Sequence, residues 1–136
     1  MKRTNIRNCE VSSEIEKQLN INFENFEFKL DNWGEVDNYA IIEKNTYVFL
    51  ECERGQKHPN TNVLKLYPYL EENPQISITL IHFFFKENKT PKNRIRLCNF
   101  VANKMKIDFG NRFNYKMITQ NDWNTIKRNT ELPSKP

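Results

Sequence analysis

Glycine is scarce in this sequence, and its scarcity excludes one large group of ligand-binding motifs. The chain of 136 residues contains three glycines. Neither a GxGxxG nor a GxxxxGK[ST] pattern occurs in it, so the glycine-rich loops that hold nucleotide phosphates are missing. The sequence therefore gives no indication of a phosphate loop.

Cysteines and long apolar runs are also few. Cys9, Cys52 and Cys98 lie far apart without a CxxC pair, which predicts neither a disulfide framework nor a zinc site. We expect reduced thiols and a cytoplasmic location. The longest apolar stretch, Ile76 to Phe85, is too short to span a membrane. The charged start of the chain is not followed by an apolar run, so no signal peptide and no membrane partner are expected.

The remaining composition is that of one folded domain. Hydrophobic residues make up 38% of the chain and aromatic residues 12%, which is enough to build a core. We expect a single domain over residues 1–128 and a flexible polar tail over 129–136. With 21 basic and 17 acidic residues the net charge is +4. That balance is compatible with nucleic acid but does not single it out as a partner.

The apolar periodicity predicts alternating helices and strands. Ser13 and Glu16 fit a capping box that begins a short helix ending near Leu19. Further along, Pro68 should kink a helix. The expected elements after the first helix are an extended segment at 23–30, strands at 36–42 and 47–53, a helix at 60–70, a strand at 76–85, a helix at 93–107, a strand at 113–118 and a last helix capped by Thr119. This order predicts an α/β fold with a mixed central β-sheet flanked by helices.

Acidic residues cluster on the two strands around Asn45. If a tight turn there pairs the strands antiparallel, Asp37 and Glu51 lie opposite each other near one end of the hairpin. Side-chain alternation then places Phe49, Glu51 and Glu53 on one face of the sheet. Two carboxylates in that position can hold Mg²⁺ or Mn²⁺ through oxygen. The other interpretation is an ordinary solvated sheet face.

This arrangement resembles the PD-(D/E)XK nuclease superfamily, with its restriction-endonuclease-like αβββαβ core. The resemblance covers roughly residues 12–85. Asp37 and Glu51 match the two metal-binding acids of the family, and Glu53 falls where lysine is usual. Position 36 is valine, where proline is common in the family.

The resemblance implies a metal-dependent endonuclease that hydrolyses DNA phosphodiester bonds with Mg²⁺ or Mn²⁺. Lys65 on the following helix is the candidate for a displaced catalytic lysine, and Lys57 is a weaker one. Glu53 would act as a base or as a third metal ligand. Glu14 on the first helix would match an auxiliary metal-binding acid, although an acid at that position also suits the helix dipole.

A second candidate surface lies on the helix at 93–107, opposite its apolar stripe. Arginine, lysine and asparagine side chains there can donate to the phosphate oxygens of DNA. The residues are Arg96, Asn99, Asn103 and Lys106. The alternative is a solvated helix face with no ligand.

Three functions stay open at this level. The first is an active nuclease, and the second is a nuclease fold that has lost catalysis and binds nucleic acid or a protein partner. The third is an interaction domain with no nucleic-acid role. Since the chain has little room for a separate target-recognition domain, a homodimer or larger complex is expected for site-specific cleavage. The histidines are assigned structural roles, His58 at a helix start or turn and His82 in the core.

Overall fold

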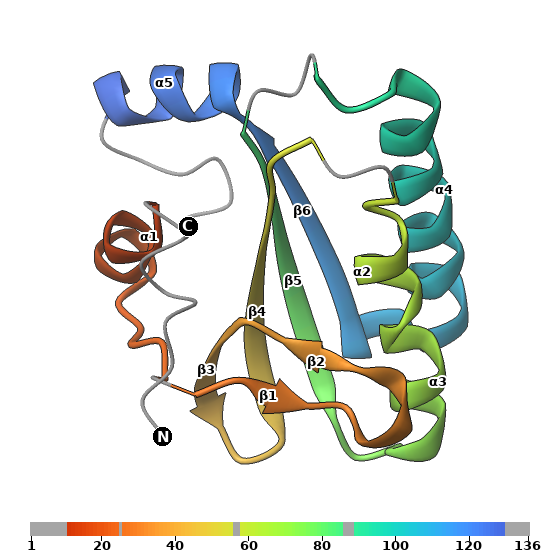
Figure 1. Ribbon diagram of the computed structural model, residues 1–136. Coiled ribbons are helices and arrows are strands. Elements are labelled where there is room, and N and C mark those ends of the chain that lie inside the picture. Colours follow the sequence, from red (N-terminus) through yellow and green to blue (C-terminus); the bar gives the residue numbers. More distant parts are fainter. Residues whose placement is uncertain (1–10, 25, 56–57, 86–88, 130–136) are drawn as a thin grey trace.

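The computed structural model describes residues 11–24, 26–55, 58–85 and 89–129 (Figure 1). Lys57, Cys9 and residues 130–136 of the predicted tail lie outside the described residues, while Asn129, the first residue of that predicted tail, is the last residue of α5. The elements run in the order α1 (Ser12–Leu19), β1 (Phe28–Lys29), η2 (Asp31–Trp33), β2 (Glu35–Val36), β3 (Asn38–Glu43), β4 (Thr46–Glu53), α2 (Thr61–Leu64), α3 (Leu66–Glu72), β5 (Ser77–Phe84), α4 (Lys92–Phe109), η4 (Gly110–Arg112), β6 (Phe113–Thr119) and α5 (Gln120–Asn129).

The central sheet has four strands in the order β3-β4-β5-β6. β3 pairs with β4 antiparallel, whereas β4–β5 and β5–β6 are parallel. Each parallel connection passes through helices, α2 and α3 before β5 and α4 before β6. The predicted α/β class with a mixed sheet and flanking helices is therefore confirmed.

The hairpin of β3 and β4 has the register that the sequence predicted. Asn45 adopts a positive φ of 64° in the turn, a conformation that asparagine tolerates better than most residues. Asn38 pairs with Leu50 and Tyr39 with Phe49. An irregularity between Ile41 and Glu43 is confined to the turn end, so it leaves this pairing unchanged.

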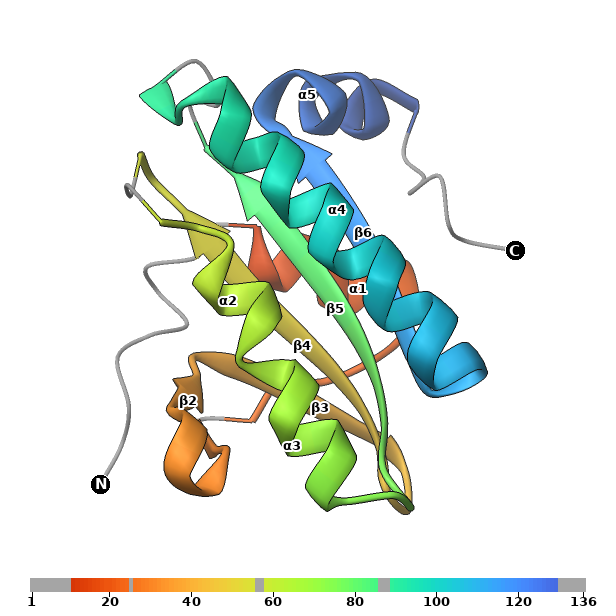
Figure 2. The same cartoon turned by 90° about the vertical axis from the view of Figure 1, so that its right-hand side faces the viewer.

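The two faces of the sheet carry separate cores. On one face, α2, α3 and α4 lie side by side and cover residues such as Phe49 and Leu80 (Figure 2). On the other face, α1 and α5 cover Leu50, Ile81 and Phe83, with Trp123 of α5 among them. Alternation along β4 therefore sends Glu51 and Glu53 toward the α2–α4 face, as predicted.

The predicted kink at Pro68 is present as a break between α2 and α3. Proline has no N–H, so it cannot donate to the carbonyl of Leu64, one helical turn earlier. The helix is interrupted at Lys65, between the last residue of α2 and the first of α3. The break places Lys65 beside the carboxyl-terminal half of β4.

Three local predictions differ from the structure. α1 has no side-chain cap, since the carboxylate of Glu16 accepts from the backbone N–H of Phe23 at 2.6 Å instead of from the helix start. The predicted extended segment at 23–30 yields only β1, which pairs with β2 in a separate two-stranded sheet. The predicted strand at 36–42 is divided by a bend at Asp37.

The expectation of reduced cysteines is wrong at Cys52, which is disulfide-bonded. Cys98 on α4 is a free, buried thiol, as expected. The error arose because sequence spacing reports only local pairs, whereas the two sulfurs of a bridge need to be close only in space.

The last helix begins where the sequence predicted. The backbone N–H of Asp122 donates to Thr119 Oγ1 at 3.1 Å, which satisfies one of the free donors of the first turn. At the end of α4, Gly110 has a φ of 60° and stops the helix. In the part of the chain that the structure describes, no helix has the length and apolar character needed to cross a membrane.

Candidate active site

Asp37 and Glu51 are brought together at the end of the β3–β4 hairpin. Since Asn38 pairs with Leu50, the next residues outward along the same register are Asp37 and Glu51. Asp37 is exposed in the bend between β2 and β3. The Glu51 side chain is only 6% exposed. We call these two residues the outer acid pair.

Lys65 reaches the outer acid pair from the break between α2 and α3. Its Nζ donates to Glu51 Oε2 at 2.8 Å. It also donates to the backbone carbonyl of Glu35 at 2.7 Å and to Asn62 Oδ1 at 2.9 Å. An ammonium group has three donors, so these contacts use all of them and fix its position.

The protonation of Glu51 reflects its burial. Burial raises the pKa of this carboxyl from 4.5 to about 7, because the charged form loses hydration. Lys65 opposes that rise through its charge and hydrogen bond, while Asp37 and Glu53 add to it through like charge. The Glu51 carboxyl therefore gains or loses its proton near neutral pH, and any further positive charge nearby would stabilise its ionised form.

Glu53 lies one pleat further along the same face, in a different environment. It is fully buried, and its Oε2 is 2.6 Å from His82 Nε2. Asn62 Nδ2 donates to the same oxygen at 2.6 Å. Among the described residues, Glu53 Oε1 is a buried oxygen with no hydrogen-bond partner. Glu53 thus faces the interior and belongs to a second set of polar residues.

His82 and Tyr115 complete that set, which we call the inner polar cluster. His82 is fully buried, and its Nδ1 is 2.7 Å from the hydroxyl of Tyr115. Burial raises the pKa of the Tyr115 hydroxyl, so this group keeps its proton and can donate to Nδ1. With Nδ1 accepting from Tyr115, Nε2 donates to Glu53, and both ring nitrogens are satisfied. The prediction of a satisfied core histidine is confirmed.

Asn62 of α2 connects the outer acid pair with the inner polar cluster. Its amide nitrogen donates to Glu53, and its amide oxygen accepts from Lys65. Neither Asn62 nor Tyr115 is among the site residues predicted from the sequence. The only available signal was spacing, since Asn62 lies one turn before Lys65 and therefore on the same side of the helix.

The remaining predicted metal ligand, Glu14, lies elsewhere. It belongs to α1, which covers the opposite face of the sheet, and its Oε2 accepts from Gln18 at 3.2 Å (Figure 1). Within the described residues, no group of three or more histidine, cysteine or acidic side chains is placed to hold a metal ion. The predicted set of four acids is therefore reduced to two that lie together.

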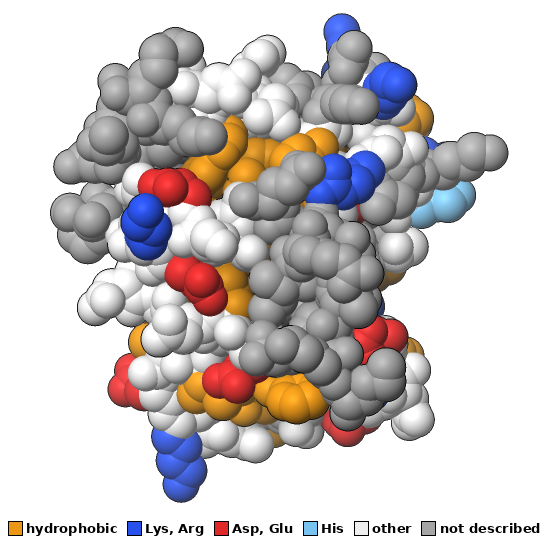
Figure 3. All heavy atoms as spheres, turned by 60° about the vertical axis from the view of Figure 1, so that its left-hand side comes forward, with side chains coloured by type: hydrophobic (Ala, Val, Ile, Leu, Met, Phe, Trp, Pro, Cys, Tyr) orange, Lys and Arg blue, Asp and Glu red, His pale blue; other side chains and the backbone are white. Residues whose placement is uncertain are grey.

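The predicted nucleic-acid-binding residues are exposed on α4. Arg96, Asn99, Asn103 and Lys106 all reach solvent. Lys106 donates to Asn114 Oδ1 at 2.9 Å, and Asn99 contacts the sulfur of Met117. On the face that bears α1, the described acidic and basic side chains are interspersed and form no patch of one sign (Figure 3). The described side chains of that face therefore form no second basic surface.

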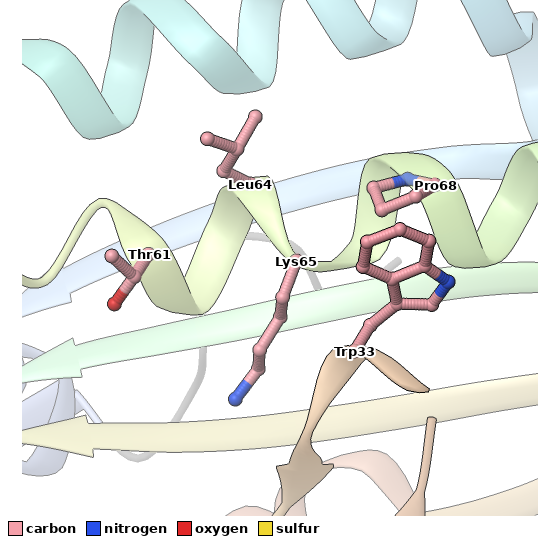
Figure 4. A pocket seen from close by; sticks show the side chains of 5 residues that line it. All are labelled: Trp33, Thr61, Leu64, Lys65 and Pro68. Carbon is pink, nitrogen blue, oxygen red and sulfur yellow. The ribbon is translucent and has the colours of Figure 1, made fainter. Parts of the chain in front are cut away.

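A pocket adjoins the outer acid pair. It has a volume of about 370 Å³ and is lined by Trp33, Thr61, Leu64, Lys65 and Pro68. The ring of Trp33 lies against Pro68, while Lys65 extends away from them (Figure 4). Its lining is almost wholly apolar, and Lys65 contributes to both the pocket and the contact with Glu51.

Comparison of the chain with protein-family models, with curated proteins and with solved structures gives no match. A function must therefore be argued from the residues and their geometry.

Proposed function

We propose that the protein is a metal-dependent nuclease of the PD-(D/E)XK type that hydrolyses DNA phosphodiester bonds. One observation supports this above all others. Lys65, one helix after β4, has its ammonium 2.8 Å from Glu51, the acid that pairs in register with Asp37. Two acids and a lysine from three separate segments thus converge, and the lysine comes from the helix expected to supply it.

The outer acid pair fits Mg²⁺ or Mn²⁺ better than a metal that needs a full protein cage. Magnesium commonly takes one or two carboxylates and completes its coordination with waters and substrate phosphates. Asp37 and Glu51 would hold the ion. When bound, it would polarise the phosphoryl oxygen and acidify a water. Glu53 does not fit as a third ligand, because its side chain is fully buried and the described residues include no group of three acidic side chains placed to hold a metal ion.

The protein groups have separable roles in this proposal. Asp37 is exposed and can meet a phosphate that arrives from solvent. Glu51 is buried and its pKa is raised to about 7, so cations beside it are needed to favour its ionised form near neutral pH. Lys65 is fixed by three acceptors that use all of its donors, so it can stabilise negative charge on the phosphate through its own charge without first being ordered.

The exposed face of α4 would contact the DNA backbone. Arg96 and Lys106 supply the charge, and Asn99 and Asn103 lie between them along the helix. These side chains donate to phosphate oxygens without reading bases, so the surface positions DNA and does not select a sequence.

A nuclease fold that binds nucleic acid or a protein without cutting is the second candidate. The contact between Lys65 and Glu51 favours it, because the ammonium already compensates the carboxylate. A pair of this kind needs no metal to be stable. The two candidates therefore differ in whether a cation competes with Lys65 for Glu51.

Cleavage of supercoiled plasmid separates them. The wild type should relax or linearise DNA with Mg²⁺ or Mn²⁺ and lose that activity with EDTA. Asp37→Asn and Glu51→Gln should each slow cleavage by about 100-fold or more, the scale seen when an electrostatic group is removed from a site. Glu43→Gln is the control, since Glu43 is an exposed acid near the turn of the same hairpin.

Calorimetric titration with Mn²⁺ completes the test. The nuclease proposal requires binding by the wild type and weaker binding by both acid variants. A wild type that cuts nothing and binds no Mn²⁺ at millimolar concentration would exclude the enzyme and leave the non-cutting candidate.

A further inference from the structure

We infer that the pocket beside Lys65 is a stacking site for an unpaired nucleobase, with Trp33 as its platform. This inference rests on the proposed nuclease function and extends it by naming the substrate class. That class is DNA with an unstacked base next to the cleaved phosphate: a single strand, a flap, a bulge or a junction.

The platform is an aromatic ring that is held in place while it faces solvent. Trp33 is 40% exposed, so part of its ring is available to a ligand. Its indole nitrogen donates to Glu72 Oε1 at 3.0 Å, so the ring is tied to α3. Figure 4 shows the ring beside Pro68, which supports one side of it.

The turn that carries Trp33 is also well defined. Leu30 N donates to the carbonyl of Gly34 at 2.8 Å, and Trp33 N donates to the carbonyl of Leu30 at 3.1 Å. Gly34 has a φ of 111°, which a residue with a side chain adopts only at a cost. A ring presented by a closed turn loses little conformational entropy when a ligand stacks on it.

The shape and chemistry of the pocket match a base better than a duplex. It is an apolar hollow of about 370 Å³ with an aromatic ring at one side. In a duplex the base faces are stacked on each other, whereas an unpaired base can be placed on an aromatic side chain.

The position of the pocket relates it to the proposed chemistry. Lys65 lines the pocket with its stem and contacts Glu51 with its ammonium. A base seated on Trp33 would therefore bring its own phosphate toward the outer acid pair. Trp33 acts here as a positioning residue for the substrate.

Binding measured in EDTA tests the inference separately from cleavage. The probes are a 12-nucleotide oligothymidine, the same length of abasic strand, and a 12-base-pair duplex. The full-length wild type should bind oligothymidine more tightly than the abasic strand, with quenching of tryptophan fluorescence. Trp33→Ala should weaken oligothymidine binding by about 5- to 140-fold, the range for loss of one stacked base. Trp33→Phe should retain most of the affinity, and Phe26→Ala, at another exposed ring, should retain all of it.

The outcomes separate this inference from the nuclease proposal. Binding that depends on Trp33 without any cleavage would support the stacking site and contradict the enzyme. Equal affinity for oligothymidine and the abasic strand, or unchanged binding by Trp33→Ala, would overturn the stacking site even if the protein cuts DNA. Absence of oligothymidine binding by the wild type would overturn it as well.

Discussion

Glu51 and Glu53 lie two residues apart on the same face of β4, yet the structure gives them different partners and different chemistry. Glu51 contacts Lys65 near the surface and has a neighbouring acid, Asp37. Glu53 is fully buried against His82 and Asn62. The carboxylate nearer the surface is therefore the one that can exchange a proton or meet a cation, while the deeper one is committed to the fold.

The difference shows that strand alternation is not enough to assign a role. Alternation correctly placed both acids on the α2–α4 face, but it treated them as equivalent. What separates them is supplied by other elements: Lys65 at the helix break contacts Glu51, whereas Asn62 of α2 and His82 of β5 contact Glu53. An acid motif on a strand thus acquires its chemistry from the residues packed over it.

Loss of His82 should give the largest effect on folding. In His82→Ala, the buried Glu53 would keep Asn62 as the only partner of Oε2 among the described residues, and it would lie beside a cavity. Loss of a hydrogen-bond partner from a buried acceptor typically costs about 1–3 kcal/mol, more for a charged group, and the cavity adds to this cost, so we expect a loss of about 3 kcal/mol or more. Urea unfolding at pH 7 measures it.

The exposed His58 provides the control, because His58→Ala should change the unfolding free energy by no more than about 0.5 kcal/mol. A loss below about 1 kcal/mol for His82→Ala would mean that the inner polar cluster contributes little to stability, and the proposed distinction between the two acids would fail.

The pH dependence of Glu51 should be the next largest effect. Its pKa rises from 4.5 in the unfolded chain to about 7 in the fold. Between these values the folded state binds more protons than the unfolded state, so the contribution of Glu51 to stability falls as pH increases. The contribution is complete below pH 4.5 and should fall by about 3 kcal/mol by pH 7 and above.

The measurement is urea unfolding of the wild type and of Glu51→Gln from pH 4 to pH 8, in EDTA. The difference in unfolding free energy between the two proteins gives the pH-dependent contribution of Glu51. Adding Mn²⁺ should restore part of the wild-type stability above pH 7, since a bound cation favours the ionised carboxylate. A difference that does not change with pH would show that Lys65 keeps Glu51 ionised throughout and would remove the proton-exchange property from the site.

Much of the framework of the site could be predicted from sequence. The distance of Asp37 and Glu51 from the turn at Asn45 fixed their pairing, because residues equidistant from a tight turn lie opposite each other. Lys65 was singled out by the family resemblance, and the helix that carries it was predicted from apolar periodicity. These predictions succeeded because they depend on local periodicity and on short-range register.

The remaining features depend on contacts between distant segments. Glu53 meets His82, which lies 29 residues later, and His82 meets Tyr115 after another 33. No local pattern reports such pairs. The pocket was missed for the same reason, since Trp33 and Pro68 come from a turn and a helix that are adjacent only in the folded chain.

The smallest predicted effect concerns the connection between the two acids. Asn62 hydrogen-bonds to both Lys65 and Glu53, so it should transmit changes from one to the other. In a double-mutant cycle, Lys65→Met and His82→Ala should show a coupling of about 0.5–1 kcal/mol in unfolding free energy, because they disturb two ends of one hydrogen-bonded network. The same cycle in an Asn62→Ala background should give a coupling near zero. Among the described residues, Asn62 is the one side chain whose hydrogen bonds join Lys65 to Glu53, the partner of His82. Coupling that persists without Asn62 would show that the outer acid pair and the inner polar cluster interact through space or through the sheet, and the two acids of β4 would then have to be treated as a single electrostatic unit.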